Sequence, residues 1–296
     1  MPLYYILLPL KEPMRKPLLF MGLVFLSSPF LSREASALLP SREQVRSSKG
    51  SRWPSSREKG AYQVRVAATG KILWKVTWET TVTQETGYKQ VEIHEQGHGQ
   101  PLRYKEPVSW KKRMVFQTPS ESAGSPVLFQ SVKGSRWNQD GKLISQMDIQ
   151  ADPQHQRIIY KDSETGKATQ STVFHWTPQM LPDELLFHWA RTLSFNNSSK
   201  SGGECLLMVS PTQRVRMQAQ LAGTEKITTP AGTFSCYRVD LAPKMLGPLK
   251  NLAPKMALWC TKDPPHFWVR YRGPVGGPGS PQAIIELVSF ERAAEE

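Results

Sequence analysis

From residue 61 onward, apolar side chains recur mainly at every second position. Successive side chains of a β-strand point to opposite faces of a sheet, so this period predicts strands with one buried and one solvated face. The clearest run is Ile72, Trp74, Val76, Trp78, Thr80 and Val82. The pattern recurs at Leu143, Met147 and Ile149, and at Val215, Met217, Ala219 and Leu221.

Short turn sequences separate these runs. They are NQDG at 138–141, ETGK at 164–167 and PAG at 230–232, and a longer Pro/Gly cluster occupies 273–281. Many strands at short spacing predict an antiparallel meander that curves towards a barrel or a sandwich.

One segment departs from the period of two. After Pro182, the stretch DELLFHWARTLSF places Leu185, Trp189 and Leu193 four residues apart, which is helical spacing, and Asp183 is a candidate N-cap. We therefore expect a mainly β fold: a curved antiparallel sheet, or half-barrel, with one short helix packed against its concave side.

The N-terminal segment has the features of a secretory signal peptide. A basic stretch at 14–16 precedes an apolar run at 17–31 and the small-x-small sequence at 35–37. The apolar run is interrupted by two serines and a proline at 27–29 and is shorter than the roughly 20 residues that span a bilayer. Cleavage after Ala37 is favoured over a membrane anchor. Because another apolar stretch precedes the basic residues, translation from Met14 is the simplest account, with Met1 as the alternative.

These observations predict three regions and a location. Residues 1–37 are expected to be a signal peptide, the Ser- and Arg-rich residues 38–60 a flexible basic linker, and residues 61–296 a single β half-barrel domain. Export through a cleaved signal peptide leads us to expect a periplasmic protein.

The chain is strongly basic, with a formal net charge of +13. Such a surface favours anionic partners. For an exported protein these are a lipid, a lipoprotein or an anionic envelope component, so we expect peripheral membrane contact and no nucleic-acid partner. Solubility alone is an equally good account of the charge. A monomer is expected.

The three cysteines, Cys205, Cys236 and Cys260, lie in the C-terminal third. In an oxidising compartment two of them can form a disulfide and one is left over. Cys236 and Cys260 lie in predicted strands that can be sheet neighbours, so this pair is favoured. No Cys-x-x-Cys or Cys–His spacing indicates a metal, and no cofactor is expected.

The sequence HEQGH at 94–98 matches the H-E-x-x-H signature of zinc proteases. That signature requires a helix, which brings both histidines to one zinc ion. Here the preceding residues alternate, and Gly97, Gly99 and Pro101 disfavour a helix. Residues four apart on a strand are separated by about 13 Å, which is too far for one metal. We expect Val91, Ile93 and Glu95 to face one way and His94 and His98 the other.

Other catalytic signatures are weaker. The chain has no G-x-S-x-G sequence, and SWKK at 109–112 matches S-x-x-K without its partner motifs. We therefore expect a protein that is not an enzyme.

Three stretches of the C-terminal third resemble a known family. They are ITTPAGTFSCYRVDL at 227–241, LAPKMALWCTKDPPHFWVRYRG at 252–273 and GSPQAIIELVSF at 279–290. They are similar to the bacterial exported family called domain of unknown function 3108. The resemblance implies a curved half-barrel similar in shape to periplasmic lipoprotein carriers, and it implies no catalytic residues.

The chain contains nine tryptophans, and most are expected to fill the core. If the half-barrel holds a cavity, aromatic side chains would line it. A repeated LAPKM sequence, at 241–245 and 252–256, predicts a mobile amphipathic loop that acts as a lid or covers the barrel end. The candidate ligand-binding residues are Trp74, Trp78, Trp189, Trp268, Met245 and Met256.

The resulting hypothesis is an exported, non-enzymatic protein that binds an apolar or lipid-bearing ligand at the cell envelope. The alternatives are a structural or protein-interaction module of the envelope and, least favoured, a zinc metallopeptidase at His94 and His98.

Overall fold

The computed structural model describes residues 57–102, 104–119, 127–193, 195, 202–244, 254–275 and 280–292. The expected signal peptide at 1–37 lies outside the described residues, as does the linker up to residue 56. The first strand begins at Glu58, three residues before the expected start of the domain at 61.

Strands make up most of the described chain. Their bounds are β1 Glu58–Val66, β2 Ile72–Gln84, β3 Tyr88–Gly99, β4 Val108–Pro119, β5 Leu128–Trp137, β6 Leu143–Asp152, β7 Arg157–Glu164, β8 Gln170–His175, β9 Met180–Pro182, β10 Gly202–Ser210, β11 Gln213–Thr229, β12 Gly232–Pro243, β13 Met256–Thr261, β14 Trp268–Pro274 and β15 Gln282–Arg292.

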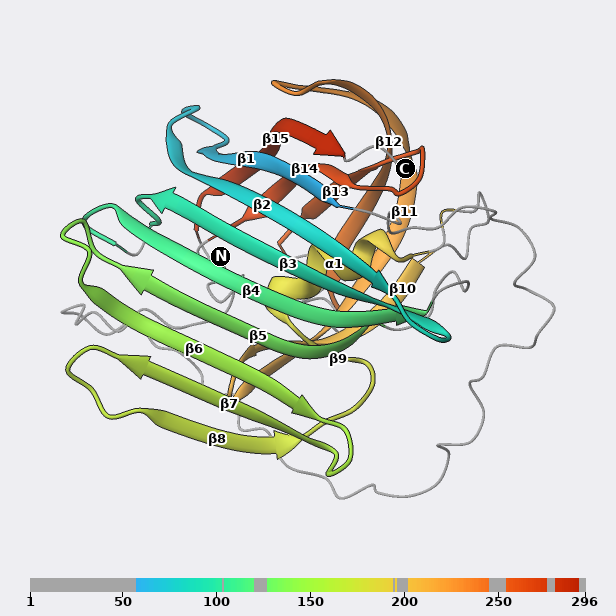
Figure 1. Cartoon of the computed structure of the whole chain (residues 1–296). Helices are drawn as coiled ribbons and strands as arrows, with labels where there is room; N and C mark the ends of the chain where they lie inside the picture. The colour runs from blue at the N-terminus through green and yellow to red at the C-terminus, as the bar shows by residue number, and fades with distance from the viewer. Residues whose placement is uncertain are drawn as a thin grey trace, which may run out of the picture.

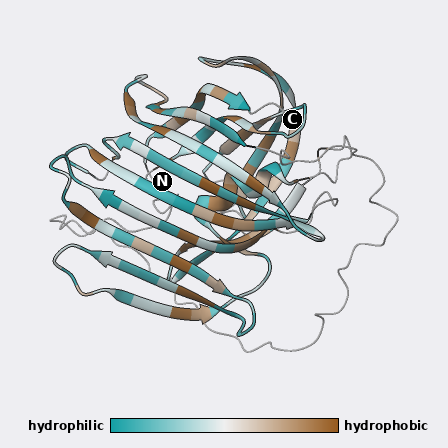
Figure 2. Cartoon of the chain, in the orientation of Figure 1, coloured by the Kyte–Doolittle hydropathy of each residue, from teal (hydrophilic) through white to brown (hydrophobic). Residues whose placement is uncertain are grey.

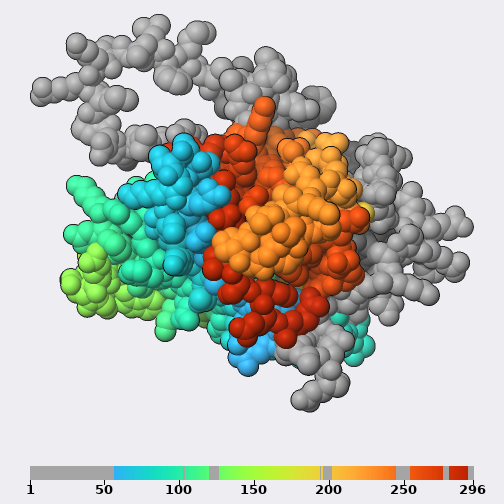
Figure 3. All heavy atoms as spheres, turned by 90° about the horizontal axis from the view of Figure 1, so that it is seen from above, coloured from blue at the N-terminus to red at the C-terminus, as the bar shows by residue number. Residues whose placement is uncertain are grey.

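All fifteen strands form one sheet in the order β8-β7-β6-β5-β4-β3-β2-β1-β15-β14-β13-β12-β11-β10-β9. Neighbouring strands are antiparallel, except that β9 and β10 run parallel. The first and last strands pair directly, so the two ends of the described chain meet in the middle of the sheet (Figures 1 and 3). The sheet curves strongly but stays open between β8 and β9. The predicted fold class is confirmed.

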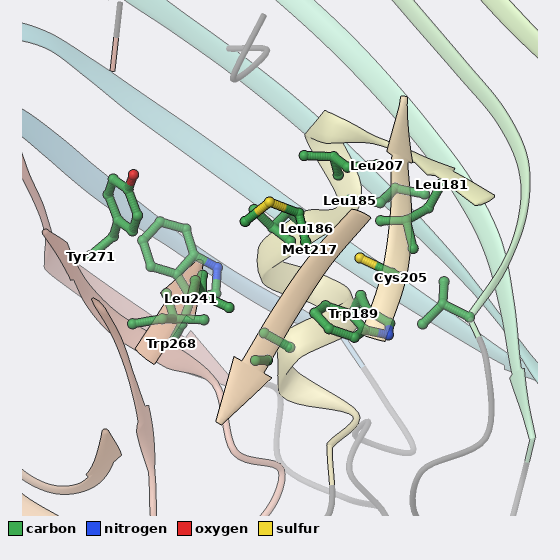
Figure 4. Close-up of a cluster of buried hydrophobic side chains, with 14 of the residues drawn as sticks. Leu181, Leu185, Leu186, Trp189, Cys205, Leu207, Met217, Leu241, Trp268 and Tyr271 are labelled. Atoms are coloured by element: carbon green, nitrogen blue, oxygen red, sulfur yellow. The ribbon is translucent and has the colours of Figure 1, made fainter. Parts of the chain in front are cut away.

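A short helical element lies inside the curve. A 3-10 turn, Asp183–Leu185, leads into helix α1, Leu186–Arg191, which sits behind β3 and β4 in Figure 1. Its apolar side chains join one large core cluster with residues of the surrounding strands, some of which Figure 4 shows. No helix in the described ranges has the length and hydrophobicity needed to span a bilayer.

The predicted alternation is confirmed along most strands, and Figure 2 shows apolar and polar residues in turn along the ribbons. Ile72 is an exception, because it is 49% exposed. A bulge between β1 and β2 sets Val64 opposite Trp74 and Arg65 opposite Ile72, so that Leu73 is the buried residue instead. Leu143, next to a similar register shift between β5 and β6, is also exposed.

The helical stripe is confirmed, since Leu185, Trp189 and Leu193 are all buried. The predicted cap is wrong. Pro182 occupies the N-cap position, and Asp183 lies within the 3-10 turn without a capping hydrogen bond. The Asp183 side chain is directed into the protein interior and is only 2% exposed.

A buried ion pair attaches α1 to the sheet. Arg191 donates two hydrogen bonds to one carboxylate oxygen of Glu58 on β1, both at 3.2 Å, and one to the other oxygen at 3.3 Å. Its Nε also donates to the carbonyl of Pro265 at 2.6 Å. Both side chains are almost completely buried, at 3% and 0% exposure. The helix is therefore held against β1 and the segment that precedes β14.

The favoured disulfide does not form, since all three cysteines are free and buried thiols. Cys236 and Cys260 do lie on neighbouring strands, β12 and β13. The register, however, places Cys236 opposite Thr261 and Tyr237 opposite Cys260. Cys260 is therefore opposite the residue after Cys236, not opposite Cys236 itself. Because side chains alternate along a strand, the two thiols point to different faces of the sheet.

Candidate functional site

The HEQGH segment lies within β3, as expected. Val91 and Ile93 are buried, whereas His94 and His98 are exposed on the opposite face. His94 contacts Glu92 at 2.6 Å and His98 contacts Ser109 at 3.1 Å. Because β3 is extended, the one-turn spacing that the zinc-protease motif requires is not formed.

Glu95 extends the inward face of β3 and leads to an internal pocket. The pocket has a volume of about 100 Å³ and lies between the helical element and the inner faces of β1–β4, β14 and β15. Its lining residues are Tyr62, Val64, Trp74, Val76, Trp78, Thr80, Ile93, Glu95, Lys112, Asp183, Glu184, Phe187, His188, Arg191, Phe267, Trp268, Val275 and Ile285.

One side of the pocket is aromatic. The rings of Tyr62 on β1 and Trp268 on β14 stack with centroids 3.7 Å apart and an interplanar angle of 5°. The Tyr62 hydroxyl donates to the Trp268 carbonyl at 2.8 Å. Trp78 stacks 5.9 Å from Tyr62, and Phe187 of α1 lies 5.0 Å from Trp268. Desolvation raises the pKa of Tyr62, so its hydroxyl stays protonated.

The other side carries charge. Glu95 on β3 and Lys112 on β4 are paired at 3.3 Å, with side chains only 17% and 5% exposed. The Trp110 indole donates to Glu95 at 3.1 Å. Its ring fits here because Gly97 is the directly opposite residue, and a Cβ at that position would overlap the indole. Burial lowers the pKa of Lys112, but the carboxylates of Glu95, Glu184 and Asp183 more than compensate, so Lys112 is charged.

Two further carboxyl groups, Asp183 and Glu184, enter the pocket from the 3-10 turn. They are 2% and 9% exposed, and apart from their contact with each other their oxygens have no hydrogen-bond partner among the described residues. Burial, and then the negative charge of Glu184, raise the pKa of Asp183 well above its ordinary value. Buried carboxyls without donors are costly, so this arrangement opposes folding locally.

His188 lies one helical turn from Glu184 and completes the polar side. Burial, assisted by the positive charge of Arg191, lowers the pKa of its imidazole to about 3. The ring is therefore neutral at physiological pH and adds no positive charge to the pocket.

The structure brings together three of the six predicted site residues. Trp74, Trp78 and Trp268 line the pocket. Trp189 points away from it, packs over Gly203 of β10 and lies beside Cys205 (Figure 4). Met256 is a core residue of β13 opposite Leu241 on β12. Met245 and the centre of the predicted lid, residues 245–253, lie outside the described residues.

The charged residues of the pocket were not predicted as a site. A signal for two of them is present in the sequence, because Glu95 and Lys112 occupy inward positions of alternating strands, after Ile93 and between Trp110 and Met114. In the sequence, Asp183 and Glu184 are typical of the first residues of a helix. Their placement near Lys112 depends on how the helix packs against the sheet.

The pocket has stacked rings on one side and a compact charged group on the other, which is the composition of sites for amphiphilic ligands. Among the described residues, no group of three histidine, cysteine, aspartate or glutamate side chains is placed to hold a metal ion.

No family model and no curated protein matches the chain, so the resemblance to family 3108 finds no support there. Three solved structures are similar to it. A "putative lipoprotein" of Parabacteroides distasonis is 14% identical over 83% of this chain and 100% of the other, with a TM-score of 0.36. A β-barrel-like protein of domain of unknown function 1849 from Brucella abortus is 8% identical over 81% and 98%, with a TM-score of 0.46. A "putative exported protein" with a YmcC-like fold from Bacteroides fragilis is 12% identical over 79% and 95%, with a TM-score of 0.36.

Proposed function

We propose that the chain is an exported, non-enzymatic protein of the periplasm that binds an apolar or lipid-bearing ligand in the pocket between α1 and the sheet. The observation that carries the proposal is the pocket itself, in which Tyr62, Trp78 and Trp268 offer apolar surface beside buried charges. The signal-peptide pattern of residues 14–37 supports export, and the basic surface suits anionic headgroups.

The size of the pocket limits what it encloses. A cavity of about 150 Å³ holds a molecule such as benzene, and the volume here is about 100 Å³. A whole acyl chain does not fit. We therefore propose that the pocket receives one end of the ligand, while the rest lies along the protein surface.

Lipid uptake tests the proposal. Delipidated protein would be incubated with a bacterial lipid extract, reisolated and analysed by mass spectrometry. Ile285→Trp reduces the pocket volume, because Ile285 on β15 lines it. Ile284→Trp is the matched control. Ile284 is the neighbouring residue, is equally half-buried and does not line the pocket. We expect the wild type and Ile284→Trp to retain a lipid and Ile285→Trp to lose it.

Circular dichroism would establish that both variants are folded. A wild type that takes up no lipid, or an Ile285→Trp variant that takes up as much as the wild type, would contradict the proposal.

A further inference from the structure

Asp183 and Glu184 are acidic residues buried in the interior, and core packing does not explain them. Their four carboxyl oxygens are buried and receive no hydrogen bond from described residues outside this pair, and both side chains line the pocket. Buried carboxyls are normally paired, because removing an uncompensated one from water is costly. A ligand that supplies hydrogen-bond donors would satisfy them.

The charges facing the pocket decide the sign of that ligand. Lys112 lines the pocket, and it already lies 3.3 Å from Glu95. Arg191 forms the buried pair with Glu58, whose carboxylate Arg292 also contacts at 3.5 Å. With Asp183 protonated, Glu95 and Glu184 still face the single ammonium of Lys112. Around Lys112 the polar side of the pocket therefore has more carboxyl groups than ammonium groups, inside a chain of net charge +13.

The aromatic side favours the same sign. The faces of Tyr62, Trp78 and Trp268 border the pocket, and aromatic faces attract ammonium groups. A negatively charged ligand group would instead be repelled by the carboxyls of the pocket. It would gain little attraction from Lys112, whose ammonium group is already paired with Glu95. A metal ion lacks the three suitably grouped ligands among the described residues.

We infer that the polar side of the pocket binds the protonated amine of an amphiphilic ligand, with Asp183 and Glu184 as its hydrogen-bond acceptors. The inference rests on the proposed function and specifies its ligand: an ammonium group small enough for the cavity, carried on an apolar body that contacts Tyr62 and Trp268.

Three eight-carbon probes that differ only in the head group test the inference: octylamine, octanol and octanoate. Binding would be followed by tryptophan fluorescence and confirmed by calorimetry at pH 7. We expect octylamine to bind at least about tenfold more tightly than octanol, which corresponds to one charge-assisted hydrogen bond, and octanoate to bind most weakly.

Variants of Asp183 and Glu184 test whether these two carboxyls cause the preference for octylamine. Asp183→Asn/Glu184→Gln keeps both shapes and is expected to lower octylamine affinity by about tenfold or more, with octanol unchanged. The control, Glu85→Gln/Asp140→Asn, makes the same two kinds of substitution in exposed turns and is expected to bind like the wild type. Thermal unfolding would confirm folding, and Asp183→Asn alone serves if the double variant is unstable.

The outcomes separate the two proposals. If none of the probes binds to the wild type, the proposed function and this inference fail together. If the probes bind but octylamine has no advantage, or octanoate binds best, this inference alone is overturned. The same holds if the double variant keeps the amine preference.

Discussion

His188 shows how strongly the interior alters a single residue. Its imidazole is buried beside Arg191, and its pKa is lowered to about 3, whereas an unfolded chain has a value near 6.5. The folded protein therefore binds fewer protons than the unfolded chain between these pH values. By linkage, the stability that His188 confers is fully present above about pH 6.5 and is lost as the pH falls towards 3.

We predict that His188→Gln flattens the acid dependence of folding. The wild type should lose roughly 2 kcal/mol of unfolding free energy between pH 6.5 and 5 through this residue, and the variant should not. Urea unfolding across this range measures the slope. His98→Gln, which replaces an exposed imidazole on the outer face of β3, should keep the wild-type slope. Equal slopes for the wild type and His188→Gln would contradict the prediction.

The residue scale also shows what periodicity reveals. The inward direction of Glu95 follows from the alternation of β3 and was predicted. Its partnership with Lys112 was not, because pairing of β3 with β4 sets these two residues directly opposite each other. The exposure of Ile72 was not predicted for a similar reason. A bulge depends on the pairing of two strands and cannot be recognised from the sequence of one of them.

At the scale of elements, α1 depends on a buried pair more than on its own length. Six residues are too few for an isolated helix to be stable in water. The core packing of Leu185, Leu186 and Trp189 and the contact between Arg191 and Glu58 hold it in place. Because α1 carries His188 and directly follows the 3-10 turn that carries Asp183 and Glu184, its docking also positions the polar side of the pocket.

We predict that Arg191→Met destabilises the protein by about 3–5 kcal/mol, since it leaves the buried Glu58 carboxylate with only the longer contact to Arg292, at 3.5 Å. The double variant Glu58→Gln/Arg191→Met should be less destabilised than the sum of the single variants. Chemical denaturation of the four proteins measures this coupling.

The exposed pair Lys167 and Glu164, 2.6 Å apart in the β7–β8 turn, provides the comparison. Its coupling should be below about 1 kcal/mol. Additive effects at Glu58 and Arg191 would show that the ion pair does not hold the helix.

At the scale of the whole molecule, β1 and β15 pair in the middle of the sheet. The fold therefore cannot be completed until the last strand is available.

We predict that the chain is exported and cleaved after Ala37 when it is expressed in a Gram-negative host. Intact-mass analysis and N-terminal sequencing of the periplasmic fraction should show a mature protein beginning at Leu38. Ala37→Arg should block cleavage, because signal peptidases require small residues there. Ala67→Arg, outside the signal segment, is the control and should be processed normally. Recovery of an uncleaved wild-type chain from the cytoplasm would contradict the prediction.

The sequence by itself determined the strands, the orientation of β3 and the buried stripe of Leu185, Trp189 and Leu193, because each depends on a period within one element. Only the tertiary structure decided the pocket, because its walls come from distant parts of the chain. Tyr62 and Trp268 stack although 206 residues separate them. The carboxyls of Asp183 and Glu184 meet the Glu95–Lys112 pair only when α1 docks inside the curved sheet, and no local pattern encodes that encounter.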